Sequence, residues 1–130
     1  MQFFELIIVT PTRVIENRTV SYVRCPGLDG SFGIMKDHAE AIFALEVGPV
    51  KIIGSDGEKW LATSGGYAEI KENRVLLLVE SAEFQEEIDV ERARKARERA
   101  EERLHQKTAD RIRAKSSLSR AINRLRIVQQ

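Results

Sequence analysis

Hydrophobic and polar positions change their period near residue 88. Before that point the chain shows short apolar runs, such as Phe4–Val9 and Val75–Val79, separated by turn signals such as Pro26–Gly30 and Gly54–Gly57. Short apolar segments between clusters of Gly, Pro and Asp are typical of all-β domains. We therefore expect residues 1–87 to form an antiparallel β-sandwich or barrel of about eight to ten strands.

Two glycine-containing segments interrupt this strand pattern. Gly33 lies in the middle of Ser31–Met35, where a glycine often marks a bulge or a close backbone contact. Ser64–Gly66 follows the apolar and polar stretch Glu58–Thr63. Because consecutive glycines weaken a strand, we expect this second segment to end the strand before it.

From Asp89 onward the spacing of apolar residues is helical, so residues 88–130 are predicted to form a second, helical domain. Asp89 suits an N-cap, because its carboxylate can accept from the free N–H groups of the first turn. Glu91 lies in that first turn, where the helix dipole favours an anion. This junction has two interpretations, an ordinary capped domain boundary or a hinge that also belongs to a ligand site.

Two apolar stripes follow the N-cap, with a break in phase between them. The first stripe contains Val90, Ala93, Ala96 or Arg97, Ala100 and Leu104, and the second contains Ile112, Leu118, Ala121, Ile122, Leu125 and Val128. The break falls at 105–110, where Thr108 or Asp110 could cap a new helix. No Pro or Gly enforces a turn, so an αα-hairpin and one long helix of about 60 Å both remain open.

Composition limits the kinds of function that this chain can have. It has 130 residues, 42% hydrophobic and 32% charged, which indicates a globular protein. The single Cys25 excludes an internal disulfide and a zinc site built on several cysteines. His38 and His105 are the only histidines, and no catalytic or metal-binding set accompanies them. We find no secretory signal and no run long enough to span a bilayer, so membrane association would require a partner.

Charge is divided unevenly along the chain, although the net charge is only +1. Residues 1–88 carry 8 Lys+Arg against 14 Asp+Glu, whereas residues 89–130 carry 13 against 6. Ten of those thirteen basic residues are arginine, the side chain best suited to bidentate contacts with phosphate and carboxylate groups. A solvated helical face would account for part of this charge but less well for the preference for arginine.

The arginines would converge if the two helices form a hairpin. Arg92 and Arg99 share one helix face, because they are seven residues apart, and Arg120 and Arg124 share another. A turn near residues 106–109 would bring Arg92 level with residue 122, between the second pair. The resulting cluster would comprise Arg92, Arg99, Arg120 and Arg124 beside Asp89 and Glu83. Held together, like charges attract an anion, which predicts a polyphosphate site; alternatively, the long side chains extend into solvent.

Three segments stand out along the chain: Gly30–Ile34 with His38, Ser64–Ile70 and Ala121–Leu125. In this order they resemble segments of a known family, the epsilon subunits of bacterial rotary (F-type) ATP synthases. Gly30–Ile34, followed by His38 and an apolar stretch, is similar to that family's Gly-x-x-Gly-Ile…His block. Ser64–Ile70 resembles its Ser-Gly-Gly strand, and Ala121–Leu125 resembles its final helix. Each block is short, but their order and the two-part architecture together are specific to the family.

The resemblance implies a β-sandwich followed by a helical hairpin, in a rotor-stalk subunit without catalytic residues of its own. It implies contacts with the gamma subunit, the ring of c subunits and the alpha/beta catalytic subunits. Such a subunit would be peripheral, on the cytoplasmic face of the bacterial cell membrane, and would take part in proton-coupled ATP synthesis. The resemblance also implies that the helices can fold down on the sandwich or extend and inhibit ATP hydrolysis.

The resemblance further implies that ATP is a regulatory ligand and that no cofactor is required. Family members that bind ATP carry the motif Ile/Leu-Asp-x-x-Arg-Ala, with arginines from both helices. Here the motif is complete, and Glu83 and Arg99 match the family's accessory positions. Arg120 and Arg124 match its second-helix arginines if the interhelical turn is about two residues shorter than in some relatives. The implied ATP-binding residues are Glu83, Ile88, Asp89, Arg92, Ala93, Arg99, Arg120 and Arg124.

Two departures from the family pattern fall near the edge expected to meet the c ring. The family often has Pro-Gly immediately before its histidine, whereas Lys36 and Asp37 precede His38 here. An acidic residue is often found where this chain has Ser31. Ser31 and His38 are therefore expected to contact gamma or the c ring, with altered details.

A different class of function, a nucleic-acid-binding β-barrel with a basic helical tail, is the main alternative. The charge of residues 89–130 permits it. However, residues 1–88 are acidic overall and show no row of aromatic residues for base stacking. We therefore expect no nucleic-acid partner, and an enzyme acting alone lacks candidate residues.

Overall fold

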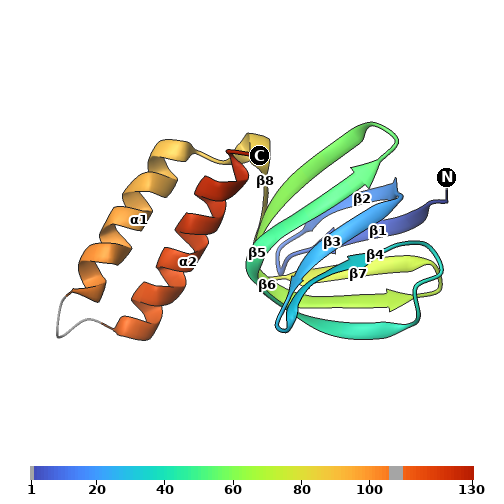
Figure 1. Cartoon of the computed structure of the whole chain (residues 1–130), viewed down its shortest axis with the longest axis horizontal. Coiled ribbons are helices and arrows are strands. Elements are labelled where there is room, and N and C mark those ends of the chain that lie inside the picture. Colours follow the sequence, from blue (N-terminus) through green and yellow to red (C-terminus); the bar gives the residue numbers. More distant parts are fainter. Residues whose placement is uncertain (1, 106–109) are drawn as a thin grey trace.

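The computed structural model describes residues 2–105 and 110–130 of the chain. Within these residues a β-sandwich of eight strands is followed by two α-helices that pack side by side (Figure 1). The elements are β1 (Phe4–Val9), β2 (Val14–Val20), β3 (Tyr22–Gly27), β4 (Gly30–Ile34), β5 (Ala41–Gly54), β6 (Gly57–Lys71), β7 (Arg74–Val79), β8 (Ala82–Phe84), the 3-10 helix η1 (Gln85–Glu87), α1 (Val90–Leu104) and α2 (Arg111–Ile127).

The strands pair in the order β2-β1-β7-β6-β5-β3-β4, and β8 adds to β6. Every pair is antiparallel except β1 and β7, which run parallel with Leu6 opposite Val75 and Ile8 opposite Leu77. The predicted antiparallel sandwich is therefore confirmed, with one parallel pair at its centre. Local patterns could not reveal that pair, because its two strands lie at opposite ends of the sandwich sequence.

The core of the sandwich is built from its own strands. Alternate side chains point inward along β1 and β7, so that Leu6, Ile8, Val75 and Leu77 are almost completely buried. The buried members of this core cluster all lie between residues 4 and 79, and none comes from the helices. Because apolar burial is the main stabilising term, the sandwich should not need the hairpin in order to fold.

A fragment of residues 1–87 is therefore expected to fold, which would test the predicted boundary between the two domains. Circular dichroism should show a β spectrum, a cooperative thermal transition and no helical signal. The full chain, measured in parallel, should show both kinds of signal. An unfolded fragment would contradict the division into residues 1–87 and 88–130.

The structure corrects our expectation that Ser64–Gly66 ends a strand. Strand β6 continues through this segment, and there it changes partner from β8 to β7. Gly65 and Gly66 adopt φ values of +104° and +146°, which side chains other than glycine rarely adopt. The glycines therefore permit an irregularity within one long strand. At Gly33 the close contact is with a side chain rather than with another backbone segment, since a Cβ there would lie 2.7 Å from the Tyr22 ring.

Both helices begin at aspartate N-caps. The Asp89 carboxylate accepts from the Arg92 backbone N–H at 3.1 Å, as predicted, and Asp110 accepts from Arg113 N–H at 3.1 Å. The alternative cap, Thr108, lies outside the described residues, as does the predicted turn at 106–109. The contact between α1 and α2 confirms the hairpin rather than one long helix.

The two predicted apolar stripes are only partly correct. Alanines form the interior seam of the hairpin, where Ala93 and Ala100 of α1 and Ala114 and Ala121 of α2 are at most 2% exposed. Predicted members Val90 and Ile112 are instead 37% and 83% exposed, so their assignment was wrong. Small side chains allow the helices to approach closely, and larger residues just off the seam are left outside it.

Candidate functional site

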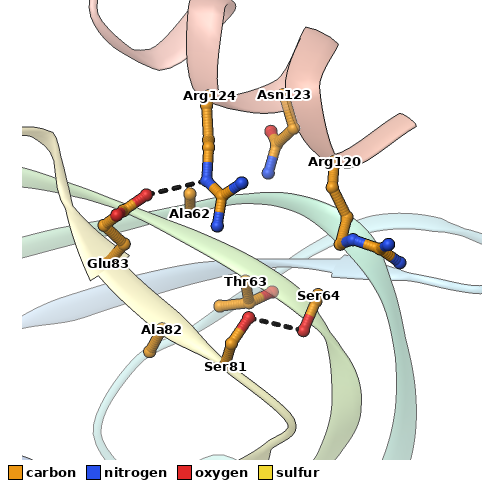
Figure 2. Close-up of a pocket in the computed structure, with 9 residues that line it drawn as sticks. All are labelled: Ala62, Thr63, Ser64, Ser81, Ala82, Glu83, Arg120, Asn123 and Arg124. Carbon is orange, nitrogen blue, oxygen red and sulfur yellow. Dashed lines mark hydrogen bonds and ion pairs between the residues drawn. The ribbon is translucent and has the colours of Figure 1, made fainter. Parts of the chain in front are cut away.

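The junction between sandwich and hairpin is held by polar contacts from β8 and η1 to α2. The Arg124 guanidinium donates from Nε to Glu83 Oε1 at 2.8 Å (Figure 2). Gln85 Nε2 donates to the carbonyl oxygens of Ile127 at 2.8 Å and Gln130 at 3.1 Å. The Ile127 carbonyl also accepts from the Gln130 N–H at 3.1 Å, so Gln85 adds a second donor at this end of α2. These contacts fix the C-terminal end of α2 against the sandwich.

A small apolar cluster completes the junction. Ala62, Ile88 and Ile127 are buried in it, and Trp60 and Val128 pack against it. Trp60 is the single tryptophan of the chain, and its indole N–H donates to Glu58 Oε1 at 2.7 Å. The fluorescence of this side chain should therefore report whether the hairpin is docked.

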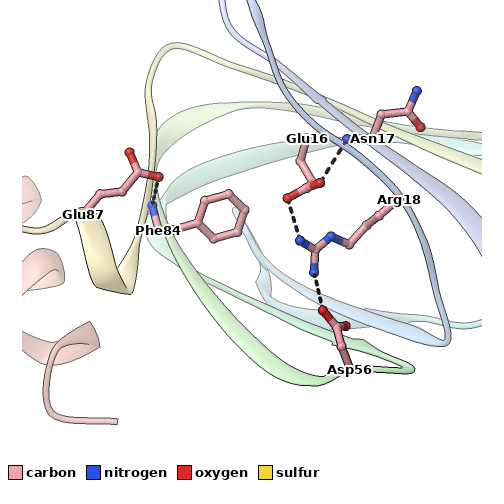
Figure 3. A network of polar contacts seen from close by, with 6 residues as sticks. All are labelled: Glu16, Asn17, Arg18, Asp56, Phe84 and Glu87. Carbon is pink, nitrogen blue, oxygen red and sulfur yellow. Dashed lines mark hydrogen bonds and ion pairs between the residues drawn. The ribbon is translucent and has the colours of Figure 1, made fainter.

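A pocket of about 220 Å³ lies next to this junction, beside the first turn of α1. Its lining combines three carboxylates with two guanidinium groups, from residues Glu83, Glu87, Asp89, Arg92 and Arg124, together with Ala93. Glu83 is engaged by Arg124, and Asp89 by the Arg92 backbone. Glu87 accepts from the Phe84 N–H at 3.4 Å (Figure 3). The first turn of α1 is thus anchored, whereas the Arg92 guanidinium has no carboxylate within ion-pair distance among residues 2–105 and 110–130.

The structure brings together five of the eight residues predicted for the ATP site. These are Glu83, Asp89, Arg92, Ala93 and Arg124. Arg120 lines an adjoining cavity that also includes Arg124, and Ile88 is buried in the apolar cluster at the junction. Arg99 is exposed and lines neither space, since seven residues place it about 10 Å farther along α1 than Arg92.

Several residues at the junction were not predicted. Glu87 directly precedes the motif at Ile88 and could have been included on that ground. Gln85 and Asn123 gave no such signal; Asn123 is only 7% exposed although periodicity treats it as a polar surface position. Thr63 of β6 lines the adjoining cavity together with residues of α2. These residues are far apart in the sequence, so no local pattern predicts that they lie together.

This arrangement offers a ligand both hydrogen-bond donors and acceptors, with three carboxylates and two guanidinium groups in the lining. Arg92 and Arg124 can donate to phosphate oxygens, while the carboxylates can accept from the amino or hydroxyl groups of a ligand. The volume of 220 Å³ is below the roughly 300–1,000 Å³ of most small-molecule sites. A nucleotide would therefore remain partly exposed, or would widen the pocket by displacing Glu83 from Arg124.

The two residues predicted to contact partners, Ser31 and His38, lie outside the junction, in the first half of the sandwich sequence. Ser31 is exposed on β4, and His38 is half-buried, with its ring edge against Phe43 and its Nδ1 2.8 Å from the Ala39 carbonyl oxygen. Asp37 adopts a φ of +65°, a conformation that aspartate tolerates better than most residues. The turn before His38 thus forms without the Pro-Gly pair that the family often has.

Other chemistry is limited in the part of the chain that the structure describes. No group of three or more His, Cys, Asp or Glu residues there is arranged to hold a metal ion. Neither of the two described α-helices has the length and hydrophobicity needed to cross a membrane. Burial raises the pKa of the Cys25 thiol to about 12, so it stays protonated at neutral pH.

Comparisons with known proteins match both parts of the chain. A family model described as "ATP synthase, Delta/Epsilon chain, beta-sandwich domain" matches residues 3–85. A second, described as "ATP synthase, Delta/Epsilon chain, long alpha-helix domain", matches residues 86–129. Together the two models span almost the whole sequence.

Individual relatives agree with these matches. The "ATP synthase epsilon chain" of Nitratidesulfovibrio vulgaris (strain DP4) is 41% identical over 124 residues, covering 94% of this chain and 92% of that protein. The protein of the same name from Desulforamulus reducens is 41% identical over 128 residues, covering 95% and 96%. A chain in the structure of the Euglena gracilis mitochondrial ATP synthase, OSCP/F1/c-ring, has a similar fold, with a TM-score of 0.81 at 23% identity, over 90% of this chain and 76% of that one.

Proposed function

This chain belongs to the ATP synthase delta/epsilon chain family, and on that premise we propose that it couples the gamma subunit to the c-subunit ring and inhibits ATP hydrolysis through its C-terminal helices. The observation that best supports the regulatory part is the construction of the junction. A stable sandwich carries a hairpin that is attached through a few side chains at one end. Such a hairpin can be released without unfolding the sandwich.

The weakness of this attachment follows from its composition. Alanines make up the seam between α1 and α2, and alanine buries little apolar area. Against the sandwich, α2 contributes mainly Ile127, the Arg124 ion pair and the carbonyls that accept from Gln85. Two arrangements that differ little in free energy are what a conformational switch requires. Extended, residues 89–130 would span about 60 Å and could reach the alpha/beta catalytic subunits.

We propose the surface around Ser31 and His38 as the contact with gamma and the c ring. Met35 and Ile42, close to His38 in the sequence, are 64% and 71% exposed. Large exposed apolar side chains are typical of surfaces that are covered in an assembly. Attachment to the membrane, at its cytoplasmic face, would then come through the complex.

ATP is the proposed ligand of the pocket beside α1, and it would favour the docked hairpin. Arg92 comes from α1 and Arg124 from α2, so both can contact one triphosphate only while the helices are antiparallel. Adenine would lie near Ile88 and Ala93. Because ATP would bind the docked form better, it would shift the equilibrium toward that form, by about 2.7 kcal/mol at a concentration 100-fold above its dissociation constant. Plentiful ATP would then keep the inhibitory helices down.

Removing residues 89–130 should test the regulatory function. In the assembled ATP synthase, the shortened subunit should still associate with gamma, because the sandwich core is intact. ATP hydrolysis by the complex should rise, most clearly when ATP is scarce. The control is the complex with the full-length chain, assayed over the same range of ATP concentrations. Equal hydrolysis at every nucleotide concentration would show that the helices are only structural.

A further inference from the structure

A second cavity, of about 140 Å³, lies between the sandwich and α2 (Figure 2) and shares Glu83 and Arg124 with the pocket beside α1. Its polar lining comes from both domains. The sandwich provides hydroxyl groups, and α2 provides two guanidinium groups and an amide. These residues are Thr63, Ser64, Ser81, Arg120, Asn123 and Arg124.

One of these hydroxyl groups lacks a partner. Thr63 is 2% exposed, and its Oγ1 forms no hydrogen bond with any other described residue. Buried polar groups are nearly always hydrogen-bonded, so this hydroxyl beside the cavity would gain a partner from a ligand that carries hydrogen-bonding groups. The neighbouring hydroxyls of Ser64 and Ser81 are 2.7 Å apart, and one of the two protons in this pair remains free to donate.

The charges around the cavity favour an anion over water alone. Arg120 donates to the hydroxyls of Ser116 at 2.8 Å and Ser117 at 3.1 Å, rather than to a carboxylate. Arg124 is paired with Glu83, the single carboxylate in the lining. The lining therefore contains two guanidinium groups, three hydroxyls and an amide, and only one carboxylate. Such a donor-rich set is typical of oxyanion sites. The volume suits a single tetrahedral oxyanion and is well below the roughly 300–1,000 Å³ of sites for larger ligands.

We propose that this cavity binds one phosphate-sized oxyanion, which bridges the sandwich and α2 and stabilises the docked hairpin independently of a nucleotide. The bridge consists of Thr63 and Ser81 on one side and Arg120 on the other. Because both sides are needed, the anion binds only when the hairpin is docked. A rising concentration of the anion therefore shifts the equilibrium toward the docked hairpin.

Inorganic phosphate is the probe for the first test, on the full-length chain. Calorimetry should show binding of one phosphate per chain, and phosphate should raise the melting temperature and keep Trp60 in its docked fluorescence state. Sodium chloride at the same ionic strength provides the comparison. If chloride has the same effect, phosphate acts only as a general salt and the proposal is wrong.

Thr63→Val separates a binding role of this residue from a structural one. Valine keeps the shape but removes the hydroxyl. Since Oγ1 has no partner, the variant should melt at the same or a higher temperature than the wild type in phosphate-free buffer. Its phosphate affinity should nevertheless fall about tenfold. Unchanged affinity in a folded Thr63→Val variant would overturn the proposal.

Two arginine variants on α2 give a matched comparison. Arg120→Gln should weaken phosphate binding at least as much as Thr63→Val, since it removes a charged donor. Arg126→Gln removes the same charge from an exposed position outside the cavity and should bind like the wild type. Equal losses in both variants would mean that phosphate responds only to the net charge of α2, against a defined site.

Competition with ATP tests whether this cavity is separate from the nucleotide pocket, with which it shares Glu83 and Arg124. Phosphate should still bind in the presence of saturating ATP. Displacement of phosphate by ATP at one-to-one stoichiometry would assign the cavity to a terminal phosphate of the nucleotide and refute a separate site. If ATP does not bind at all, the nucleotide proposal fails, whereas the phosphate measurements still decide this one.

Discussion

Replacing Gly66 by alanine is expected to lower the free energy of unfolding by about 3 kcal/mol or more, a loss of roughly 10–20 °C in melting temperature. A Cβ at this position would lie 2.0 Å from the Leu78 carbonyl oxygen, in the strand that pairs with it. The φ of +146° adds strain for any side chain. Chemical denaturation followed by circular dichroism would measure the change.

Gly57→Ala is the matched control for this substitution. Gly57 also has a positive φ, of +110°, but a Cβ there would have no heavy atom within 4 Å. The control therefore includes the backbone strain without the collision, and it should cost only about 1 kcal/mol. Similar losses in the two variants would mean that the backbone moves aside at Gly66, so that the close approach to β7 is not a constraint.

Arg92→Ala is expected to weaken ATP binding to the isolated chain by roughly 10- to 100-fold. The guanidinium faces the pocket beside α1 and would make a charge-assisted contact, worth about 1.5–3 kcal/mol, with the triphosphate. Arg94→Ala is the control, because two residues along a helix turn the side chain to nearly the opposite face, where Arg94 pairs with Glu91. Calorimetry at up to millimolar ATP would compare the three chains.

Arg124→Ala should weaken binding at least as strongly, but its interpretation requires a second measurement. This substitution also removes the ion pair with Glu83, so the hairpin could undock before ATP is added. Trp60 fluorescence without ATP would separate undocking from the loss of a ligand contact. Equal losses in the Arg92, Arg94 and Arg124 variants, or no binding by the wild type, would exclude the proposed nucleotide site.

Local chemistry explains which parts of the fold were predictable from sequence. The Asp89 N-cap depends on residues within one turn of it, and the apolar run Val75–Val79 lies within a single strand. Burial along the helices depends instead on where each helix contacts the rest of the molecule. Ile112 is 83% exposed whereas Ile127 is 1% exposed, because α2 meets the sandwich only near its C-terminal end. Periodicity identifies an apolar face but not which part of it is covered.

In the candidate site, too, local relationships were predictable from the sequence and long-range ones were not. Asp89, Arg92 and Ala93 are adjacent in the sequence, and the helical period alone places them together. Arg124 followed from the assumed register of the hairpin, and the structure brings it to the same pocket. Arg99 was grouped with Arg92 because the two share a helix face, but a shared face does not determine distance along the axis, and Arg99 does not line the pocket. Thr63 belongs to a strand sixty residues away from its neighbours on α2, and no local pattern indicates that relationship.

The parallel pairing of β1 with β7 also affects how the chain folds during synthesis. β1 lies between β2 and β7, so the sheet cannot close until Arg74–Val79 is available. At about 5–20 residues per second, a ribosome takes roughly 3–13 seconds to make the intervening segment. During that interval β1 can pair with β2 but not with β7, and pairing of distant strands is intrinsically slow. The nascent sandwich is thus a natural substrate for chaperones, while the short-range contacts of the helices form quickly once the strands have closed.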